Sequence, residues 1–422
     1  MKHELIKRDV NVASARQLGL PIGGFRAMHE IILPQRLRRG VSDQIAWDVA
    51  NAAPIAFKTL EGDAYTYVAE SGRVRIVRGI TEDAGLVIEL SSDNWDNYYY
   101  EMRTNYGLLY AEAVRFLRGK FAMWDSWEPA LRCLYSGTPI YNPATLDLRD
   151  LDGAKLDIHR SFLPDDDPAH MAHFLHTTGY LHIRSAFSKE EMARISEELD
   201  QVRGAAVEGE VFSRWGTDDQ GRKTVFDLHY LTLKSRLMKD LDNHAMVRFL
   251  TGLAGEHVVP SEDRDCGTHA ITREFSGNSD SFGVLGWHQD CGLGGCPVTC
   301  PRVHVGIQVD AANADSSKLY FLAGSASRSC HLNISPEQAR NLPIAAFDTQ
   351  PGDATVHLGC ILHAANTAQG RNRRRTIYTR FVNPMALDIF DPFGSVDQVI
   401  PGISGDQSMP SPADMAALVE AR

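Results

Sequence analysis

The sequence lacks any apolar run long enough to span a bilayer, any internal repeat and any low-complexity tract. Because a membrane-spanning helix needs about 20 consecutive apolar residues, we expect no membrane span. Positive charge is also in deficit: 43 Lys and Arg stand against 54 Asp and Glu, a net charge of −11. Binding to a nucleic-acid backbone is therefore not favoured. The length of 422 residues and the 43% hydrophobic content suit a soluble globular protein with room for two domains.

The most informative feature that is present is a set of two histidines and one carboxylate in the second half of the chain. His288 and Asp290 are two residues apart, a spacing that places both side chains on one side of an extended strand. His363 follows much later and must come from a distant strand that folds back beside them. Two imidazoles and one carboxylate hold Fe(II) and leave positions open for a cosubstrate and O2. The pattern predicts a non-haem iron oxygenase.

The segments around this triad have the patterns of strands and turns. Pro351-Gly352-Asp353 has the composition of a turn, and a basic run that ends in Arg374 and Arg375 comes shortly after His363. Alternation of apolar and polar residues predicts strands over 303–310, 317–323, 354–358 and 376–382.

These residues resemble the phytanoyl-CoA dioxygenase family of Fe(II)/2-oxoglutarate oxygenases. The resemblance rests on Trp287, the triad, Gly352-Asp353 and the following arginines. It extends to the family's first strand and first helix, at 178–183 and 187–191, and so spans 165–390. Two turn motifs match loosely: Val309-Asp310-Ala311, and 323–326 without the usual Pro and His.

The resemblance implies a double-stranded β-helix (jelly roll) within an α+β chain, and an enzyme that uses Fe(II), 2-oxoglutarate and O2. His288, Asp290 and His363 would be the iron ligands and the catalytic set, with succinate and CO2 released. Arg374 would pair with the distal carboxylate of 2-oxoglutarate through two charge-assisted hydrogen bonds. Arg375 is the alternative, because strand alternation lets only one of the two point inward. Thr376 is a candidate to give the cosubstrate a hydroxyl contact.

Two nearby features also have simpler interpretations. His357, on the strand before His363, is expected to be a packed histidine, although its position also allows it to face the site. The basic run 371–375 is expected to be a solvated loop apart from the one arginine that binds the cosubstrate.

Three of the seven cysteines, Cys291, Cys296 and Cys300, follow Asp290 closely, with His304 four residues beyond. A Cys3His zinc site is therefore conceivable. Its spacing is not a standard one, so we expect a loop of reduced thiols at the mouth of the active site. The odd number of cysteines, the absence of a signal peptide at the start of this sequence and the neighbouring redox iron favour a cytoplasmic location.

Residues 1–150 are predicted to form a smaller α/β body. A hairpin over 64–68 and 73–78, a third strand over 84–90, and helices from Asn94, over 110–117 and from 124 are expected. This order resembles the sterol-carrier-protein domain, a fold that buries lipids between a sheet and helices. Seven aromatic residues of this body either line an apolar pocket or pack its core, and the sequence favours neither interpretation. They are Trp95, Tyr98, Tyr99, Tyr100, Phe121, Trp124 and Trp127.

The remaining segments complete the expected organisation. Residues 151–168, rich in aspartate, are interpreted as a linker, and 169–390 as the jelly roll. Residues 391–422 are interpreted as a tail with a short helix over 412–421.

The combination predicts an enzyme of secondary metabolism that hydroxylates a bulky hydrophobic molecule, such as a steroid, terpenoid, polyketide or acyl thioester. Desaturation, epoxidation or rearrangement would use the same iron site. A catalytically silent lipid-binding or carrier protein that keeps the jelly roll is the main alternative, and a mononuclear metal hydrolase or isomerase is another. A homodimer is left open.

Overall fold

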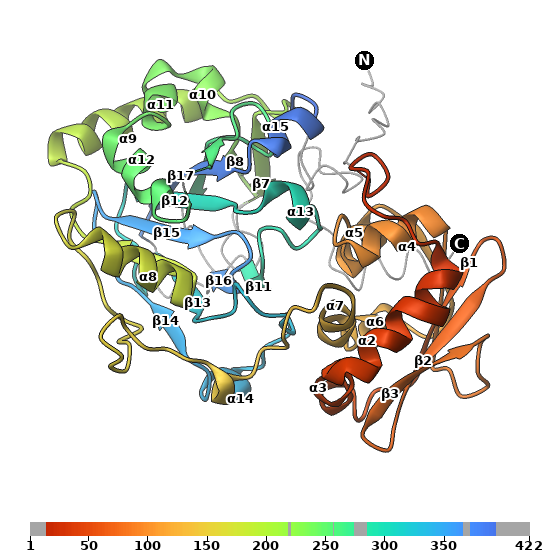
Figure 1. Cartoon of the computed structure of the whole chain (residues 1–422). Coiled ribbons are helices and arrows are strands. Elements are labelled where there is room, and N and C mark those ends of the chain that lie inside the picture. Colours follow the sequence, from red (N-terminus) through yellow and green to blue (C-terminus); the bar gives the residue numbers. More distant parts are fainter. Residues whose placement is uncertain (1–13, 218–220, 256, 274–284, 366–371, 394–422) are drawn as a thin grey trace, which may run out of the picture.

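The protein forms two bodies that lie side by side (Figure 1). The structure is a computed structural model and describes residues 14–217, 221–255, 257–273, 285–365 and 372–393. We call 14–136 the N-terminal body and the described residues from 168 onward the jelly-roll body. No helix in the described ranges is long and apolar enough to cross a membrane. The predicted helix over 412–421 lies outside these ranges.

The N-terminal body is built on one five-stranded sheet in the order β3-β2-β1-β4-β5. The central pair, β1 and β4, is parallel, and the other neighbours are antiparallel. The predicted hairpin is confirmed, with Ser71 and Gly72 at positive φ in its turn. The strands are β1 (Ile55–Thr59), β2 (Ala64–Glu70), β3 (Arg73–Arg78), β4 (Leu86–Leu90) and β5 (Val114–Arg118).

The sequence prediction was wrong for residues 110–117, which do not form a helix. Helix α5 (Asn105–Tyr110) ends where the predicted helix begins, and β5 pairs antiparallel with β4 at the edge of the sheet. Val114 is buried whereas Arg115 and Leu117 are exposed, as expected of an edge strand with one covered face. Strand β1 was missed because its apolar residues are buried in succession and give no alternation.

Helices cover this sheet and bury the aromatic residues between them. Ser91 caps α4 by accepting a hydrogen bond from the backbone N–H of Asn94, as predicted. Trp95, Trp124 and Trp127 are at most 1% exposed. Their rings contact tyrosine rings of the same cluster, largely edge to face, so these aromatics pack the core. The helices are α1 (Phe25–Ala27), α2 (Leu33–Arg36), α3 (Ser42–Asp48), α4 (Ser92–Tyr99), α6 (Phe121–Asp125) and α7 (Glu128–Ser136), with π-helical turns at Met28–Ile32 and Leu37–Val41.

The second body is the expected jelly roll, with a larger sheet in the order β6-β15-β12-β17-β10-β8-β7 and a smaller sheet in the order β11-β16-β13-β14. Strands β12 and β17 are buried at every position, because both faces of the larger sheet are covered. The strands are β6 (Tyr180–Ile183), β7 (Ser213–Thr217), β8 (Lys223–Leu228), β9 (Val259–Pro260, beside β17), β10 (His269–Arg273), β11 (Leu285–His288), β12 (Val303–Gln308), β13 (Leu319–Leu322), β14 (Ile344–Ala346), β15 (Ala354–Leu358), β16 (His363–Ala365) and β17 (Arg374–Val382).

Helices α9 to α12 gather on one side of the larger sheet (Figure 1). The predicted helix after Phe187 is confirmed as α9, which begins with a capping box formed by Ser188 and Glu191. Part of the predicted linker packs against the jelly-roll body, because Phe162 is fully buried and forms a β-bridge with Ile183. The helices are α8 (Pro168–Thr178), α9 (Lys189–Gly204), α10 (Leu231–Lys234), α11 (Arg236–Leu241), α12 (Ala245–Gly252), α13 (Cys296–Thr299), α14 (Pro336–Ala339) and α15 (Met385–Ile389).

The two bodies share an apolar core at their junction. Leu293 and Val298, from the connection between β11 and β12, and Phe390 pack into the core of the N-terminal body. The backbone N–H of Thr104 donates to the carbonyl of Leu293 at 3.3 Å, and that of Gly295 donates to the carbonyl of Glu101 at 2.9 Å. The N-terminal body therefore rests directly on the loop that follows Asp290.

Replacing Gly107 by alanine is expected to weaken the packing between the N-terminal body and the loop that carries Leu293. Alanine favours helices over glycine by about 1 kcal/mol, but a Cβ at Gly107 would lie 2.0 Å from the carbonyl oxygen of Leu293. We expect the free energy of unfolding to fall by about 1–3 kcal/mol. Urea unfolding measures this, with Gly204→Ala in α9 as the control, because open space surrounds Gly204. Gly204→Ala is expected to stabilise the protein slightly. If Gly107→Ala stabilised it by the same amount, the close contact with Leu293 would be contradicted.

Candidate metal centre and cosubstrate pocket

The three predicted metal ligands converge between two strands of the smaller sheet. Strands β11 and β16 pair so that His288 lies directly opposite His363, and the two ring centroids are 4.1 Å apart. One oxygen of Asp290, Oδ1, is 3.7 Å from His288 Nε2 and 3.8 Å from His363 Nε2. One detail differs from the prediction: β11 ends at His288, so Asp290 reaches the site from the following turn.

The backbone orients both imidazole rings for metal binding. His288 Nδ1 lies 2.8 Å from the carbonyl oxygen of Gly286, and His363 Nδ1 lies 3.1 Å from that of Ile361. A proton on each Nδ1 is donated to these carbonyls, which leaves the Nε2 lone pairs directed toward Asp290.

Burial and neighbouring charge put these groups in the protonation states that a metal requires. Burial lowers the pKa of His288 to about 4 and also lowers the pKa of His363, so both imidazoles are neutral at pH 7. Burial opposes ionisation of Asp290, but the surrounding histidines outweigh it and hold the pKa of this carboxyl well below its usual range.

A second pair of histidines lies on the other side of Asp290. His304 and His357 are opposite each other on β12 and β15, their rings stack at 4.9 Å, and both are at most 2% exposed. Their Nε2 atoms are 3.4 and 3.1 Å from the second carboxylate oxygen, Asp290 Oδ2. The carboxylate therefore bridges two histidine pairs.

Geometry distinguishes the two pairs, although either could bind a metal together with Asp290. The side chain of His288 is 26% exposed, so a ligand on that side stays accessible to small molecules. The His304–His357 pair lies behind the carboxylate, where a hydrogen bond of 3.1 Å between His357 Nε2 and Asp290 Oδ2 orients Asp290. Sequence reasoning interpreted His357 as a packed histidine and missed this role. The available signal was one histidine on each of two buried, paired strands.

A buried ion pair fixes the backbone at Asp290. Arg302 Nη1 donates to the carbonyl oxygen of Asp290 at 2.7 Å, and Arg302 Nε donates to Asp265 at 2.9 Å. The side chains of Arg302 and Asp265 are both fully buried. Sequence analysis did not find this pair, because nothing local connects residues 37 positions apart.

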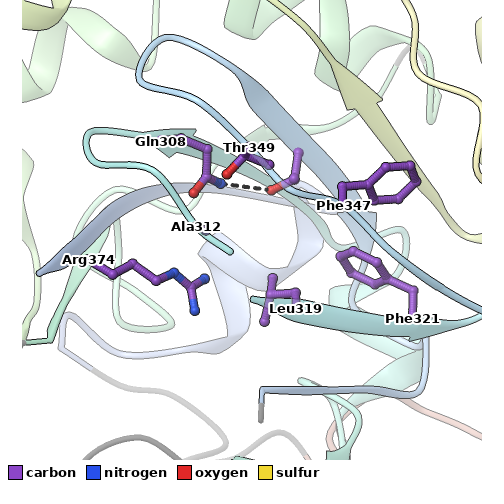
Figure 2. Close-up of a pocket in the computed structure, with 8 residues that line it drawn as sticks. Gln308, Ala312, Leu319, Phe321, Phe347, Thr349 and Arg374 are labelled. Atoms are coloured by element: carbon purple, nitrogen blue, oxygen red, sulfur yellow. Dashed lines mark hydrogen bonds between the residues drawn. The ribbon is translucent and has the colours of Figure 1, made fainter. Parts of the chain in front are cut away.

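A pocket beside the triad presents the arginine expected to bind the cosubstrate. Figure 2 shows Arg374 extending toward the space between Gln308, Ala312 and Leu319. Phe321 links this hollow to the triad, because it lines the hollow and lies opposite His363 on the neighbouring strand. The lining residues are Gln308, Ala312, Leu319, Phe321, Phe347, Thr349, Thr355 and Arg374.

Arg374 is suited to bind an anion in this pocket. Its side chain is on the buried strand β17 and is 3% exposed. Nη2 lies 3.4 Å from the hydroxyl of Tyr378, and the buried Nε has no hydrogen-bond partner among the described residues. Arg273 lies directly opposite on β10 and brings a second guanidinium close. A buried cation beside another cation is costly unless an anion is bound between or beside them.

The neighbouring arginine, Arg375, points to the other face of β17. Its guanidinium makes two hydrogen bonds of 2.9 Å to Asp310 and one of 2.8 Å to Asp200, and so is fully engaged away from the pocket. Thr376 donates to Gln308 Oε1 at 3.1 Å and reaches the pocket only through that side chain. Of the three residues predicted for the cosubstrate, the structure directs Arg374 alone into the hollow.

Comparison with known families locates this site within one segment. Residues 175–376 match the phytanoyl-CoA dioxygenase (PhyH) family model. This PhyH segment, just under half of the chain, runs from α8 into β17. It contains the triad, the second histidine pair and Arg374. No curated protein matches the sequence.

Solved structures with a similar fold are distant from this chain. The 2-oxoglutarate-dependent epimerase SnoN from nogalamycin biosynthesis is 19% identical, with 51% of this chain and 84% of SnoN aligned and a TM-score of 0.40. AviO1 from Streptomyces viridochromogenes Tue57 is 17% identical over 52% of this chain and 96% of AviO1, with a TM-score of 0.41. EctD from S. alaskensis with 2-oxoglutarate and 5-hydroxyectoine is 16% identical over 64% and 96%, with a TM-score of 0.44.

Proposed function

We propose that this chain is an Fe(II)- and 2-oxoglutarate-dependent oxygenase that hydroxylates a bulky hydrophobic small molecule. The observation that carries the proposal is the convergence of His288, Asp290 and His363 beside a pocket that presents the buried guanidinium of Arg374. The reaction would consume O2 and 2-oxoglutarate and release succinate and CO2 with the hydroxylated product.

Each group has a defined task in this proposal. Two neutral imidazoles and one carboxylate would hold Fe(II), which when bound supplies the activation of O2. Arg374 would bind the distal carboxylate of 2-oxoglutarate with charge-assisted hydrogen bonds. Phe321 and Leu319 would keep water from the space between this carboxylate and the triad.

The substrate class rests on the resemblance of residues 1–150 to a sterol-carrier domain. The N-terminal body rests on the loop after Asp290, which places it close to the site. Hydroxylation is the simplest outcome of the proposed chemistry, and the same residues would serve desaturation or rearrangement.

The direct test is a visible absorption spectrum of the purified protein without oxygen. A weak charge-transfer band that requires both Fe(II) and 2-oxoglutarate would support the binding of iron and cosubstrate together at this site. Absence of the band in folded, iron-loaded protein would refute the proposal. Succinate formation on addition of O2 and hydrophobic candidate substrates then identifies the substrate class.

Replacing Arg374 by alanine is expected to raise the 2-oxoglutarate concentration required for half-maximal turnover by about ten- to a hundredfold. A hydrogen bond to a charged group contributes about 1.5–3 kcal/mol, and each 1.4 kcal/mol is about tenfold in affinity. Steady-state kinetics measures the effect. Arg373→Ala is the control, because Arg373 is 42% exposed and pairs with Asp310 and Asp200. A raised requirement in Arg375→Ala but not in Arg374→Ala would contradict the assignment.

A further inference from the structure

Four cysteines from two distant segments meet next to the metal triad. Cys291, Cys296 and Cys300 lie in the connection between β11 and β12, and Cys360 lies in the turn between β15 and β16. The sulfur of Cys360 is 3.2 Å from that of Cys291, 3.8 Å from that of Cys296 and 3.4 Å from that of Cys300. None of the four forms a disulfide.

The three separations from Cys360 suit a shared metal ion better than a covalent bond, and the sulfurs of Cys291, Cys296 and Cys360 all lie within 4.8 Å of one another. A disulfide requires sulfurs about 2.05 Å apart. Four thiolates around Zn²⁺, each about 2.3 Å from the metal in a tetrahedron, lie about 3.8 Å from one another. One sulfur with three sulfur neighbours at 3.2 to 3.8 Å has no covalent interpretation, and a bound metal ion would account for the convergence of all four.

We propose that Cys291, Cys296, Cys300 and Cys360 bind one zinc ion as a structural site separate from the iron triad. This set differs from the Cys3His group that the sequence analysis considered, and the proposal departs from its expectation of a loop of reduced thiols. His304 does not join the cysteines, because its Nε2 faces Asp290 and its backbone lies in the larger sheet. The fourth ligand is Cys360, 60 residues from Cys300.

Two arginines, each of which is also paired with a carboxylate, lie near the cluster. Four thiolates and one Zn²⁺ carry a net charge of −2. Arg132, which donates to Glu101 at 3.0 Å, lies close enough to Cys291 and Cys296 to interact with them electrostatically. Arg302 does the same for Cys300. Arg132 lies in α7 of the N-terminal body, and Arg302 directly precedes β12 in the jelly-roll body. Positive charge therefore reaches the cluster from both bodies.

The location gives the zinc site a structural task. Cys291 directly follows Asp290, and Cys360 precedes His363 by three residues. Gln289 Nε2 donates to the carbonyl oxygen of Cys360 at 2.5 Å, so the two ligand-bearing segments are already in contact. The ion would fasten these segments together and hold the loop on which the N-terminal body rests. With four protein ligands it has no open coordination position, as is typical of structural zinc.

The first test uses the full-length wild-type protein, purified under reducing conditions from zinc-supplemented cells. Elemental analysis is expected to give one zinc per chain that remains after a chelator has removed iron. X-ray absorption at the zinc edge is expected to show four sulfur ligands at about 2.3 Å. Absence of zinc, zinc with nitrogen and oxygen ligands, acid-labile sulfide or disulfides in a thiol titration would each overturn the proposal.

Variants separate this site from the iron centre. Cys360→Ser is expected to lose the zinc, whereas Cys133→Ser, at a buried cysteine in α7, keeps it. His363→Ala is expected to keep zinc and lose iron, so failure of the proposed function leaves the zinc result readable. Zinc content unchanged in Cys360→Ser would overturn the ligand assignment. If Cys360→Ser does not fold, the X-ray absorption spectrum of the wild-type protein at the zinc edge tests the ligand assignment by itself.

Discussion

Replacing His363 by alanine is expected to abolish iron-dependent turnover while the fold is retained. His363 supplies one of the two imidazoles that face Asp290 Oδ1, and its ring is directly opposite His288. Loss of a residue that merely orients a metal ligand costs about 10–100-fold in metal affinity or activity, so loss of the ligand itself is expected to cost more. Iron titration, turnover and the anaerobic charge-transfer band measure the effect together.

Two further histidine variants make this result specific. His159→Ala is the control, because His159 is exposed in a loop away from the site, and it is expected to behave as wild type. His357→Ala removes a group 3.1 Å from Asp290 Oδ2 and is expected to weaken iron binding by about 10–100-fold without abolishing it. A charge-transfer band of normal intensity in His363→Ala would contradict the assignment of His363 as an iron ligand. Complete loss of iron in His357→Ala but not in His363→Ala would favour the buried pair.

Replacing Asp265 by alanine is expected to lower the free energy of unfolding by about 3–5 kcal/mol. Asp265 is fully buried and faces two guanidinium groups, those of Arg302 and Arg380. Without its carboxylate, these buried positive charges lose their common counter-charge. Because Arg302 also holds the carbonyl of Asp290, we expect iron affinity to fall as well. Urea unfolding and iron titration measure the two effects.

The matched control is an exposed ion pair of the same chemistry. Asp93 and Arg16 are 64% and 69% exposed and 2.6 Å apart, and such pairs contribute about 0–1 kcal/mol. Asp93→Ala is therefore expected to leave stability nearly unchanged. A loss below about 1 kcal/mol in Asp265→Ala would show that the buried pair is not a main support of the site.

Much of the local structure was predictable because its causes are local. The hairpin around Ser71-Gly72, the cap at Ser91 and the capping box at Ser188 depend on residues within a few positions of each other. Strand β15 has the predicted bounds, because the turn Pro351-Gly352-Asp353 sets its start. The helix predicted over 110–117 was wrong because the pairing partner of that segment, β4, is distant in sequence.

The sequence by itself predicted a metal centre of this type and named its three candidate ligands, because residue chemistry and the His-x-Asp spacing are local properties; the structure brings the three side chains together. It also narrowed the cosubstrate arginine to two neighbours, since alternation along a strand admits one of them. Only the tertiary structure shows that Arg374 lines the pocket while Arg375 points away from it, because the carboxylates that engage Arg375 come from other segments. Only the tertiary structure likewise places His304 and His357 behind Asp290, and Cys360 beside the other three cysteines. These groups meet through strand pairing and loop packing across long sequence separations, and no local pattern records such contacts.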